Sequence, residues 1–74
     1  MYFVYILENK KDKSLYIGYT NDLERRFIEH KKEVPEYKII YYECYQCENY
    51  ARSRERKLKY YGSAWRALKK RIGA

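Results

Sequence analysis

The sequence predicts a small α/β (α+β) domain, in which a three-stranded, mostly antiparallel sheet is flanked by helices in the order β-β-α-β-α-α. Two aromatic and β-branched segments, residues 2–8 and 14–20, enclose a polar loop and are typical of a β-hairpin. A third such segment, residues 37–45, lies between stretches with helical patterns. One domain, residues 1–74, is expected, with a small core, because a chain of 74 residues buries only about 60% of its unfolded surface.

The first helix is expected to begin at Asn21 and to end near Lys32. Asn21 and Glu24 fit a capping box, and Asp22 adds negative charge at the positive end of the helix dipole. Pro35 disfavours helix in the residue before it, so the helix should stop ahead of that point.

Two helices are expected after the third strand. The first covers residues 48–61 and ends at Gly62, a residue typical of helix C-termini. Ser63 then caps a short last helix, in which Trp65, Leu68 and Ile72 fall on one face.

The apolar segments and the cysteines limit the classes of protein to which the chain can belong. The N-terminal run YFVYIL is too short to span a bilayer and has no basic residues before it, which argues against a membrane helix or a signal peptide. A cytoplasmic protein is the expectation. Cys44 and Cys47 could form at most one disulfide, and with His30 they supply only three of the four ligands of a structural zinc. We interpret them as free, partly buried thiols.

The charge is distributed unevenly along the chain. Residues 1–49 carry eight Lys/Arg and nine Asp/Glu, whereas residues 50–74 carry nine Lys/Arg and a single acid, Glu55. A basic half with interleaved aromatic residues suits a polyanion such as DNA or RNA, because neutralised phosphates release counterions. The alternative is a solvated helical surface that keeps a small protein soluble. A helix that lies on a membrane surface explains the sequence less well, since the charged residues do not separate from one long apolar stripe.

The first helix carries two chemically capable residues. Arg26 and His30 are four apart and share a face next to Leu23 and Phe27, which should anchor the helix to the sheet. By themselves such residues are most often simply solvated.

A lone carboxylate and two tyrosines complete the candidates. Glu55 lies between Ala51 and Leu58 on the face expected to pack inward. It could form a salt bridge with Arg52 or Lys59, or bind a hard cation such as Mg²⁺, and local reasoning leaves both open. Tyr5 and Tyr16 lie on neighbouring strands and could share one face of the sheet.

In chain order, the residues FVY (3–5), YIG (16–18), Arg26, His30 and Glu55 form a pattern that resembles the GIY-YIG nuclease superfamily. The likeness covers essentially the whole chain and is greatest to the small, standalone, single-domain bacterial branch. It implies that the two motif tyrosines, Tyr5 and Tyr16, line a cleft, and that one of them activates the attacking water. It also implies that Arg26 stabilises charge on the phosphate, that His30 assists proton transfer or positions the nucleophile, and that Glu55 anchors a divalent metal. The resemblance further implies that Gly18 matches the glycine of the second tripeptide, where a side chain would crowd the strand.

The reaction implied by the resemblance is endonucleolytic hydrolysis of a phosphodiester, with Mg²⁺ or Mn²⁺, leaving a 5′-phosphate. The resemblance favours DNA over RNA as the substrate, with a role in DNA repair or recombination. The cations expected to contact nucleic acid are Arg52, Arg56, Lys59, Arg66, Lys69 and Lys70. An ordinary tyrosine, with a pKa near 10, is a poor base at neutral pH, so Arg26 and the metal are expected to lower that pKa.

Two positions depart from the family pattern. Phe3 stands where the first tripeptide often has glycine, and no asparagine follows Asn49, although family endonucleases often have one after the metal carboxylate. Ser63 could take its place. Turnover therefore stays open. The alternatives are a non-catalytic nucleic-acid-binding module with a vestigial site and, third, a protein-interaction domain that uses its tyrosine-rich surface. The chain has no room for a separate sequence-reading domain, so specificity would come from substrate structure or from a protein partner, and the oligomeric state is open.

Overall fold

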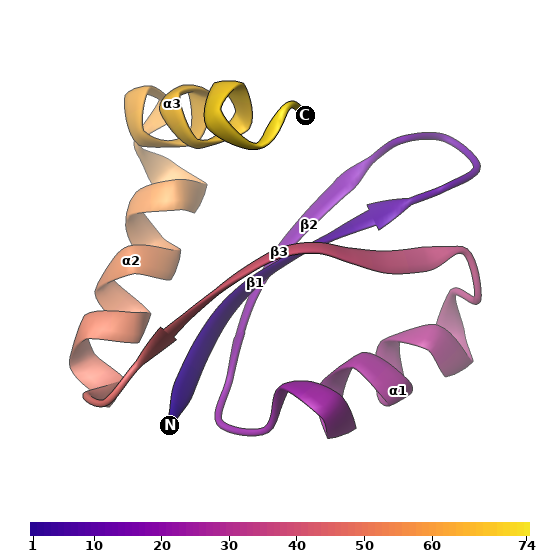
Figure 1. The fold of residues 1–74 in the computed structure, drawn as a ribbon, viewed down its shortest axis with the longest axis horizontal. Coiled ribbons are helices and arrows are strands. Elements are labelled where there is room, and N and C mark those ends of the chain that lie inside the picture. Colours follow the sequence, from indigo (N-terminus) through magenta and orange to yellow (C-terminus); the bar gives the residue numbers. More distant parts are fainter.

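A computed structural model describes residues 1–74 and has the predicted order of elements (Figure 1). Three strands and three helices follow one another in the sequence β-β-α-β-α-α. Their bounds are β1 (Tyr2–Asn9), β2 (Leu15–Thr20), α1 (Leu23–Glu33), β3 (Tyr37–Tyr45), α2 (Glu48–Tyr60) and α3 (Gly62–Ile72). The fold class predicted from the sequence is confirmed.

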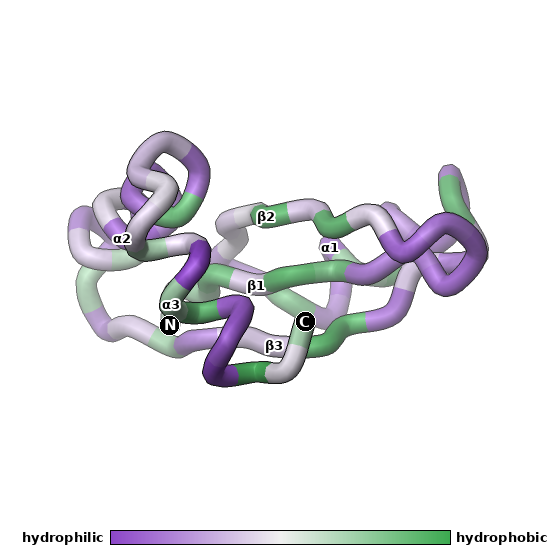
Figure 2. Tube along the Cα trace, turned by 90° about the horizontal axis from the view of Figure 1, so that it is seen from above, coloured by the Kyte–Doolittle hydropathy of each residue, from purple (hydrophilic) through white to green (hydrophobic).

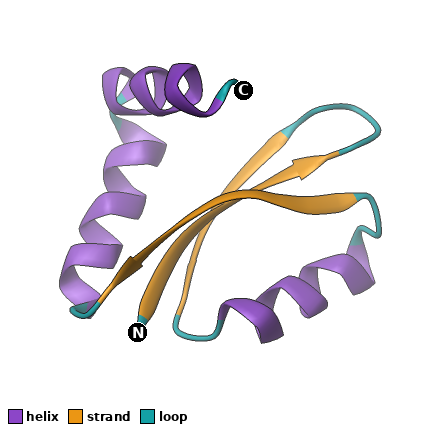
Figure 3. Ribbon diagram, viewed as in Figure 1, coloured by secondary structure: helices purple, strands orange, loops and turns teal.

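The sheet is antiparallel throughout, with strand order β2-β1-β3, so the N-terminal strand is central and both β2 and β3 are edge strands (Figures 1 and 3). The alternation of side chains along β1 divides the molecule into two sides. Val4 and Ile6 pack with Leu58 of α2 and Leu68 of α3, whereas Tyr5 points to the side of α1, where it meets His30. Apolar positions concentrate along the strands, and hydrophilic positions predominate on the helices (Figure 2).

The core is small and lies on one side of the sheet. Its fully buried members in the helices are Ala51, Leu58 and Leu68, each no more than 2% exposed. Trp65 and Ile72 pack against this cluster from α3, as the spacing predicted. None of the three helices combines the length and hydrophobicity needed to cross a bilayer.

A register shift divides β3 into two halves. Ile6 of β1 pairs with Tyr41 but Leu7 pairs with Ile39, so Ile40 is an extra residue on β3. An extra residue of this kind reverses which face the following side chains occupy. Odd-numbered residues of β3 therefore face α1 before the shift and face α2 after it.

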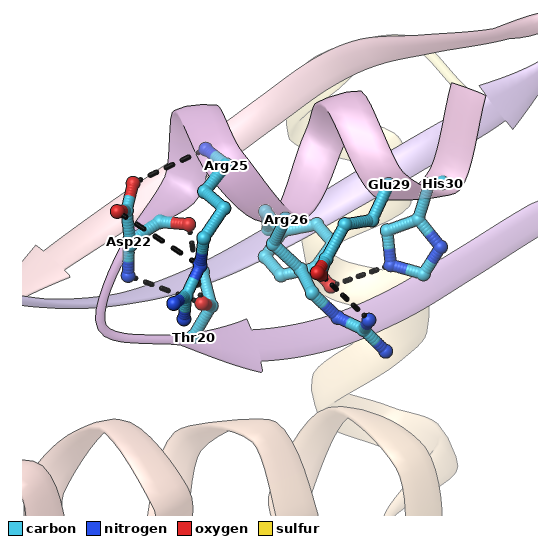
Figure 4. A network of polar contacts seen from close by, with 7 residues as sticks. Thr20, Asp22, Arg25, Arg26, Glu29 and His30 are labelled. Atoms are coloured by element: carbon cyan, nitrogen blue, oxygen red, sulfur yellow. Dashed lines mark hydrogen bonds and ion pairs between the residues drawn. The ribbon is translucent and has the colours of Figure 1, made fainter. Parts of the chain in front are cut away.

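The ends of the helices differ from the predictions. Asp22, not Asn21, is the N-cap of α1, and its carboxylate accepts a hydrogen bond of 3.1 Å from the backbone N–H of Arg25 (Figure 4). Asp22 can perform the cap that Asn21 was expected to perform, one residue later.

The junction of the last two helices was also predicted wrongly. Gly62 does not cap α2 but is the first residue of α3, and Ser63 lies inside the first turn and makes no capping bond. The bend is made by Tyr61, in extended conformation, whose N–H bonds the carbonyl of Lys57. The left-handed glycine cap occurs instead at Gly73, with φ of 75°, after α3.

Both cysteines are free and exposed, so the prediction of partial burial is wrong. Cys44 lies on β3 at a position that alternates with two inward residues, Glu43 and Tyr45, and therefore points to solvent. Cys47 is the N-cap residue of α2.

The inward position next to Cys44 is occupied by a carboxylate that ties β3 to both C-terminal helices. Glu43 accepts hydrogen bonds from Tyr41 and Tyr45, each 2.6 Å long, and pairs with Arg54 of α2 at 3.0 Å. Arg71 of α3 in turn donates to the Tyr41 hydroxyl at 3.1 Å. Burial alone would raise the pKa of Glu43, but the bonds from Arg54 and the two tyrosines outweigh it and hold that pKa below its usual range.

Candidate active site

The side chain of Tyr5 lies across Gly18, its partner in the β1–β2 register. A Cβ at position 18 would collide with the hydroxyl end of the Tyr5 ring and would approach Cε1 of Tyr16 to 2.9 Å. Glycine is therefore required so that the Tyr5 hydroxyl can reach across the edge strand.

His30 meets Tyr5 from the last turns of α1. Its Nε2 lies 2.9 Å from the Tyr5 hydroxyl oxygen, and the side chain is buried, with 8% exposed. The imidazole ring centre is 4.8 Å from that of Tyr16, and the two tyrosine rings are 6.3 Å apart. His30 is thus a packed, hydrogen-bonded member of a cluster with the two motif tyrosines and is not solvated.

Arg26 lies one turn earlier on α1 and is exposed. Its Nη1 pairs with Glu29 at 3.1 Å, and its guanidinium extends from the helix past the neighbouring strand (Figure 4). The positive charge of Arg26 also acts on Tyr5, and Glu29 foremost and then Tyr5 raise the pKa of Arg26.

Burial controls the protonation of the Tyr5–His30 pair. Burial foremost, and then the neighbouring Tyr16, raise the pKa of Tyr5 to about 12, and Arg26 only partly offsets them. Arg26 lowers the pKa of Tyr5, as expected, but burial and Tyr16 outweigh it, so the net shift is upward. Burial, followed by the positive charge of Arg26, lowers the pKa of His30 below its ordinary value of 6.5. At neutral pH the pair is a protonated phenol hydrogen-bonded to a neutral imidazole.

Tyr37, at the start of β3, is a member of this cluster that the sequence did not single out. Its ring meets His30 edge to face, with centres 6.1 Å apart and an interplanar angle of 89°, and lies 6.4 Å from Tyr16. Tyr37 reaches the α1 side only because the register shift in β3 reverses the alternation. No sequence signal marked that shift.

Glu55 approaches from α2, which packs on the other side of the sheet. Its side chain is 23% exposed and pairs with Lys59 at 3.1 Å, so one of the two expected salt bridges is present. Its negative charge is the smallest of the named influences on the pKa of Tyr5, and no hydrogen bond or ion pair joins Glu55 to Tyr5, Tyr16 or His30. Ala51 and Leu58 on the same helix are fully buried, as predicted, whereas Glu55 lies at the boundary of that face.

A groove of about 390 Å³ surrounds the carboxylate, and we call it the Glu55 groove. It is lined by Tyr19, Arg52, Glu55, Arg56, Lys59 and Tyr60. Nowhere in the chain do three or more His, Cys, Asp or Glu side chains gather as a metal-binding cluster. Glu55 is the single carboxylate that lines this groove, among three cations, and it is paired with Lys59.

The six cations expected to contact nucleic acid do not all lie at the site. Arg52, Arg56 and Lys59 line the Glu55 groove, and the guanidinium of Arg52 lies 5.4 Å from the centre of the Tyr19 ring. Lys69 lies 5.7 Å from the centre of the Trp65 ring on α3. The remaining two, Arg66 and Lys70, are exposed on α3 and line neither this groove nor any other.

Comparison with known proteins agrees with this arrangement. The family described as the GIY-YIG catalytic domain matches residues 1–59, which include every candidate from Tyr5 to Glu55. A UPF0213 protein of Haloquadratum walsbyi is 40% identical over 68 residues, which amount to 81% of this chain and 75% of that protein. No solved structure matches the chain at a significant level. On the strength of a family match that spans most of its length, the chain belongs to the GIY-YIG family and contains a nuclease-like domain.

Proposed function

We propose that the domain is a divalent-metal-dependent endonuclease that hydrolyses phosphodiester bonds in DNA. The observation that carries the proposal is the contact between the Tyr5 hydroxyl and a buried, neutral His30, with Arg26 one turn earlier on the same helix and Glu55 on α2. These groups supply a proton acceptor, a cation and a carboxylate, which are what phosphodiester hydrolysis requires.

The tyrosine and histidine would act as a relay. As the attacking water transfers a proton to the Tyr5 oxygen, the proton of Tyr5 moves to Nε2 of His30, so the phenolate is never released as a free anion. A pKa of about 12 makes Tyr5 a poor base alone, and the neutral imidazole behind it supplies the missing basicity. Tyr16, which is partly exposed beside His30, would orient the phosphate or the water.

Arg26 and Glu55 would manage charge. The exposed guanidinium of Arg26 would stabilise negative charge that develops on the phosphate. Glu55 would hold Mg²⁺ or Mn²⁺, and the bound ion would supply Lewis-acid stabilisation of the leaving oxygen. To do so, Glu55 must exchange its ion pair with Lys59, which lies on the exposed side and costs little to break.

A cleavage assay tests the proposal. Branched, nicked and single-stranded DNA are incubated with the protein and either Mg²⁺ or Mn²⁺, and products are resolved with and without chelator. Glu55→Ala and His30→Ala should each reduce cleavage at least about a hundredfold, as loss of a group acting in the transition state does. Glu24→Ala, which removes an exposed carboxylate from the first turn of α1, is the matched control. Equal cleavage by the wild type and Glu55→Ala would exclude the enzyme.

A second candidate function is a nucleic-acid-binding module with a vestigial site. The Glu55–Lys59 ion pair favours it, because a carboxylate already neutralised by Lys59 has less charge for a metal. It predicts salt-sensitive binding without metal-dependent cleavage, and uniform loss of affinity across sequences on replacing Lys69 and Lys70 by Glu. An affinity for DNA that does not change between low and physiological salt would exclude both candidates.

A further inference from the structure

A second groove lies along β2, next to the candidate site but outside it. It has a volume of about 560 Å³, and we call it the Trp65 groove. Its lining residues are Lys13, Leu15, Tyr16, Ile17, Lys59, Trp65 and Lys69. It therefore spans the β1–β2 loop, the edge strand, the end of α2 and α3.

The lining indicates the chemistry of an occupant. Three lysines and no carboxylate line the groove, so it favours an anionic ligand over a cationic one. Trp65 is the only tryptophan of the chain, is partly buried, and presents its ring to the groove beside the ammonium of Lys69. A ligand with a flat ring and adjacent phosphates matches this combination, because aromatic side chains stack bases and lysines contact phosphates.

Lys13 gives an independent reason to regard the groove as functional. It is the only residue other than glycine with a positive φ, at 66°. This left-handed conformation is energetically unfavourable for a residue with a side chain, whereas glycine adopts it without that penalty. The loop holds it there, because the N–H of Lys13 bonds the carbonyl of Asn9 at 2.8 Å and the N–H of Ser14 bonds the carboxylate of Asp12 at 2.9 Å. Strained residues of this kind concentrate where the side chain itself is needed.

The Trp65 groove shares residues with the candidate site. Lys59 lines both grooves and pairs with Glu55 at 3.1 Å, and Tyr16 lines the Trp65 groove while its ring contacts His30. A chain whose phosphate is held between Arg26 and Glu55 would therefore continue into the Trp65 groove. The base that reaches Trp65 must be unpaired, because in a duplex both faces of each base are covered by its neighbours.

We propose that the Trp65 groove binds an unpaired nucleotide flanking the cleaved bond, with its base against Trp65 and its phosphates on Lys13, Lys59 and Lys69. The proposal rests on the proposed function and narrows its substrate to nucleic acid with a single-stranded segment at the site. All of α3, including Trp65, lies beyond residues 1–59, which the family matches. The groove is therefore lined partly by the family domain and partly by a segment outside it.

Trp65 itself provides the measurement. In chelator, where no cleavage occurs, a single-stranded dT oligonucleotide should quench the tryptophan fluorescence to saturation. A duplex of equal length, shown to bind by the anisotropy of an attached dye, should leave that fluorescence nearly unchanged. Replacing Trp65 by Leu should weaken binding of the single strand about tenfold, which corresponds to loss of one stacked base.

Lys13 provides a test in which stability and binding move in opposite directions. Lys13→Gly should raise Tm, since glycine relieves the positive φ, and should weaken binding of the dT oligonucleotide several-fold. Lys11→Gly removes the same charge from the same loop, but Lys11 does not line the groove, so it should lower Tm and affect binding less.

The outcomes separate the two proposals. Single-stranded DNA that is bound and cleaved while Trp65 fluorescence and the affinity of Trp65→Leu stay unchanged would overturn the Trp65 groove and leave the proposed function intact. Failure to bind any nucleic acid would overturn both. Equal effects of Lys13→Gly and Lys11→Gly on binding would also refute the groove, even if Trp65→Leu failed to fold.

Discussion

Replacing Gly18 by alanine tests whether the Tyr5 ring is held across β2. The new Cβ would lie closer to the Tyr5 hydroxyl end than side chains ever pack, and 2.9 Å from Cε1 of Tyr16. The obstacle is not a flexible chain end, because Tyr5 is 1% exposed and its hydroxyl is bonded to His30. The ring must therefore shift, and the bond to His30 must lengthen or break.

The magnitude follows from these two effects. Overpacking a filled site costs about 1–3 kcal/mol. Loss of the Tyr5–His30 hydrogen bond adds about 0.5–1.5 kcal/mol. We expect a loss of roughly 2–4 kcal/mol, in a domain whose size suggests a total stability of about 4–11 kcal/mol. The corresponding fall in Tm is roughly 10–30 °C.

The assay is urea unfolding, monitored by circular dichroism, of the wild type, Gly18→Ala, Tyr5→Ala and the double variant. Gly62→Ala is the matched control, because a Cβ at that position meets only Nη1 of Arg66, at 3.8 Å. It should change the free energy of unfolding by less than about 0.5 kcal/mol or increase it. In the double variant the clash is absent, so the two losses should not add.

Two results would refute this account of Gly18. One is a Gly18→Ala protein whose free energy of unfolding lies within about 0.5 kcal/mol of the wild type. The other is simple additivity of Gly18→Ala and Tyr5→Ala, which would show that the added methyl group does not touch the tyrosine.

Further predictions concern titration and packing. Because the pKa of Tyr5 is raised to about 12, stability present below pH 10 should be lost between pH 10 and 12, and Tyr5→Phe should reduce that loss in alkaline melts. The pKa of His30 is lowered, so its stabilising contribution is complete above pH 6.5 and falls as pH drops through the folded pKa; an NMR titration with a midpoint at or above 6.5 would contradict the burial of its charge. Glu43 likewise contributes above its unfolded pKa of 4.5 and loses that contribution in acid, so Glu43→Gln should be less stable at neutral pH and should show a weaker dependence on acid in the same unfolding assay. Tyr37→Ala should broaden the His30 imidazole resonances and move its pKa toward 6.5, whereas Tyr37→Phe should preserve both; equal spectra for the two variants would show that the ring does not position His30.

The elements of the fold were predictable because the chain follows simple periodicities. The strands were predicted to within a residue at each end, and the inward face of α2 was identified from Ala51 and Leu58. Alternation also placed Tyr16 and Gly18 on one face of β2, which is the face that meets Tyr5.

The errors arose where local chemistry allows neighbouring solutions. Asp22 and Asn21 are equally good caps, and only the path of the chain after β2 decides between them. Gly62 looked like a C-terminal cap, but Tyr61 makes the bend in extended conformation and leaves glycine to begin the next helix.

The parts of the site that could not be predicted depend on tertiary packing. A strict alternation over residues 37–45 would place Tyr37 on the same face as Glu43, and the extra residue Ile40 separates them. The high pKa of Tyr5 likewise follows from its burial beneath α1, which no sequence window contains. The family resemblance supplied the candidate residues of the site, but their protonation follows from the fold.

The central position of β1 has a consequence for how the chain acquires its structure. Its two partners are separated by a long stretch of chain, since β2 follows after a short loop whereas β3 begins at Tyr37. The β1–β2 hairpin and α1 can form from nearby contacts, but closing the second side of β1 requires ordering a loop of nearly thirty residues, as its bounds show. Until then, one side of β1 offers unpaired backbone groups to any extended segment. Pairing with β3 is therefore expected to be the slow step of folding, and α2 and α3 can bury Val4 and Ile6 only once the sheet is complete.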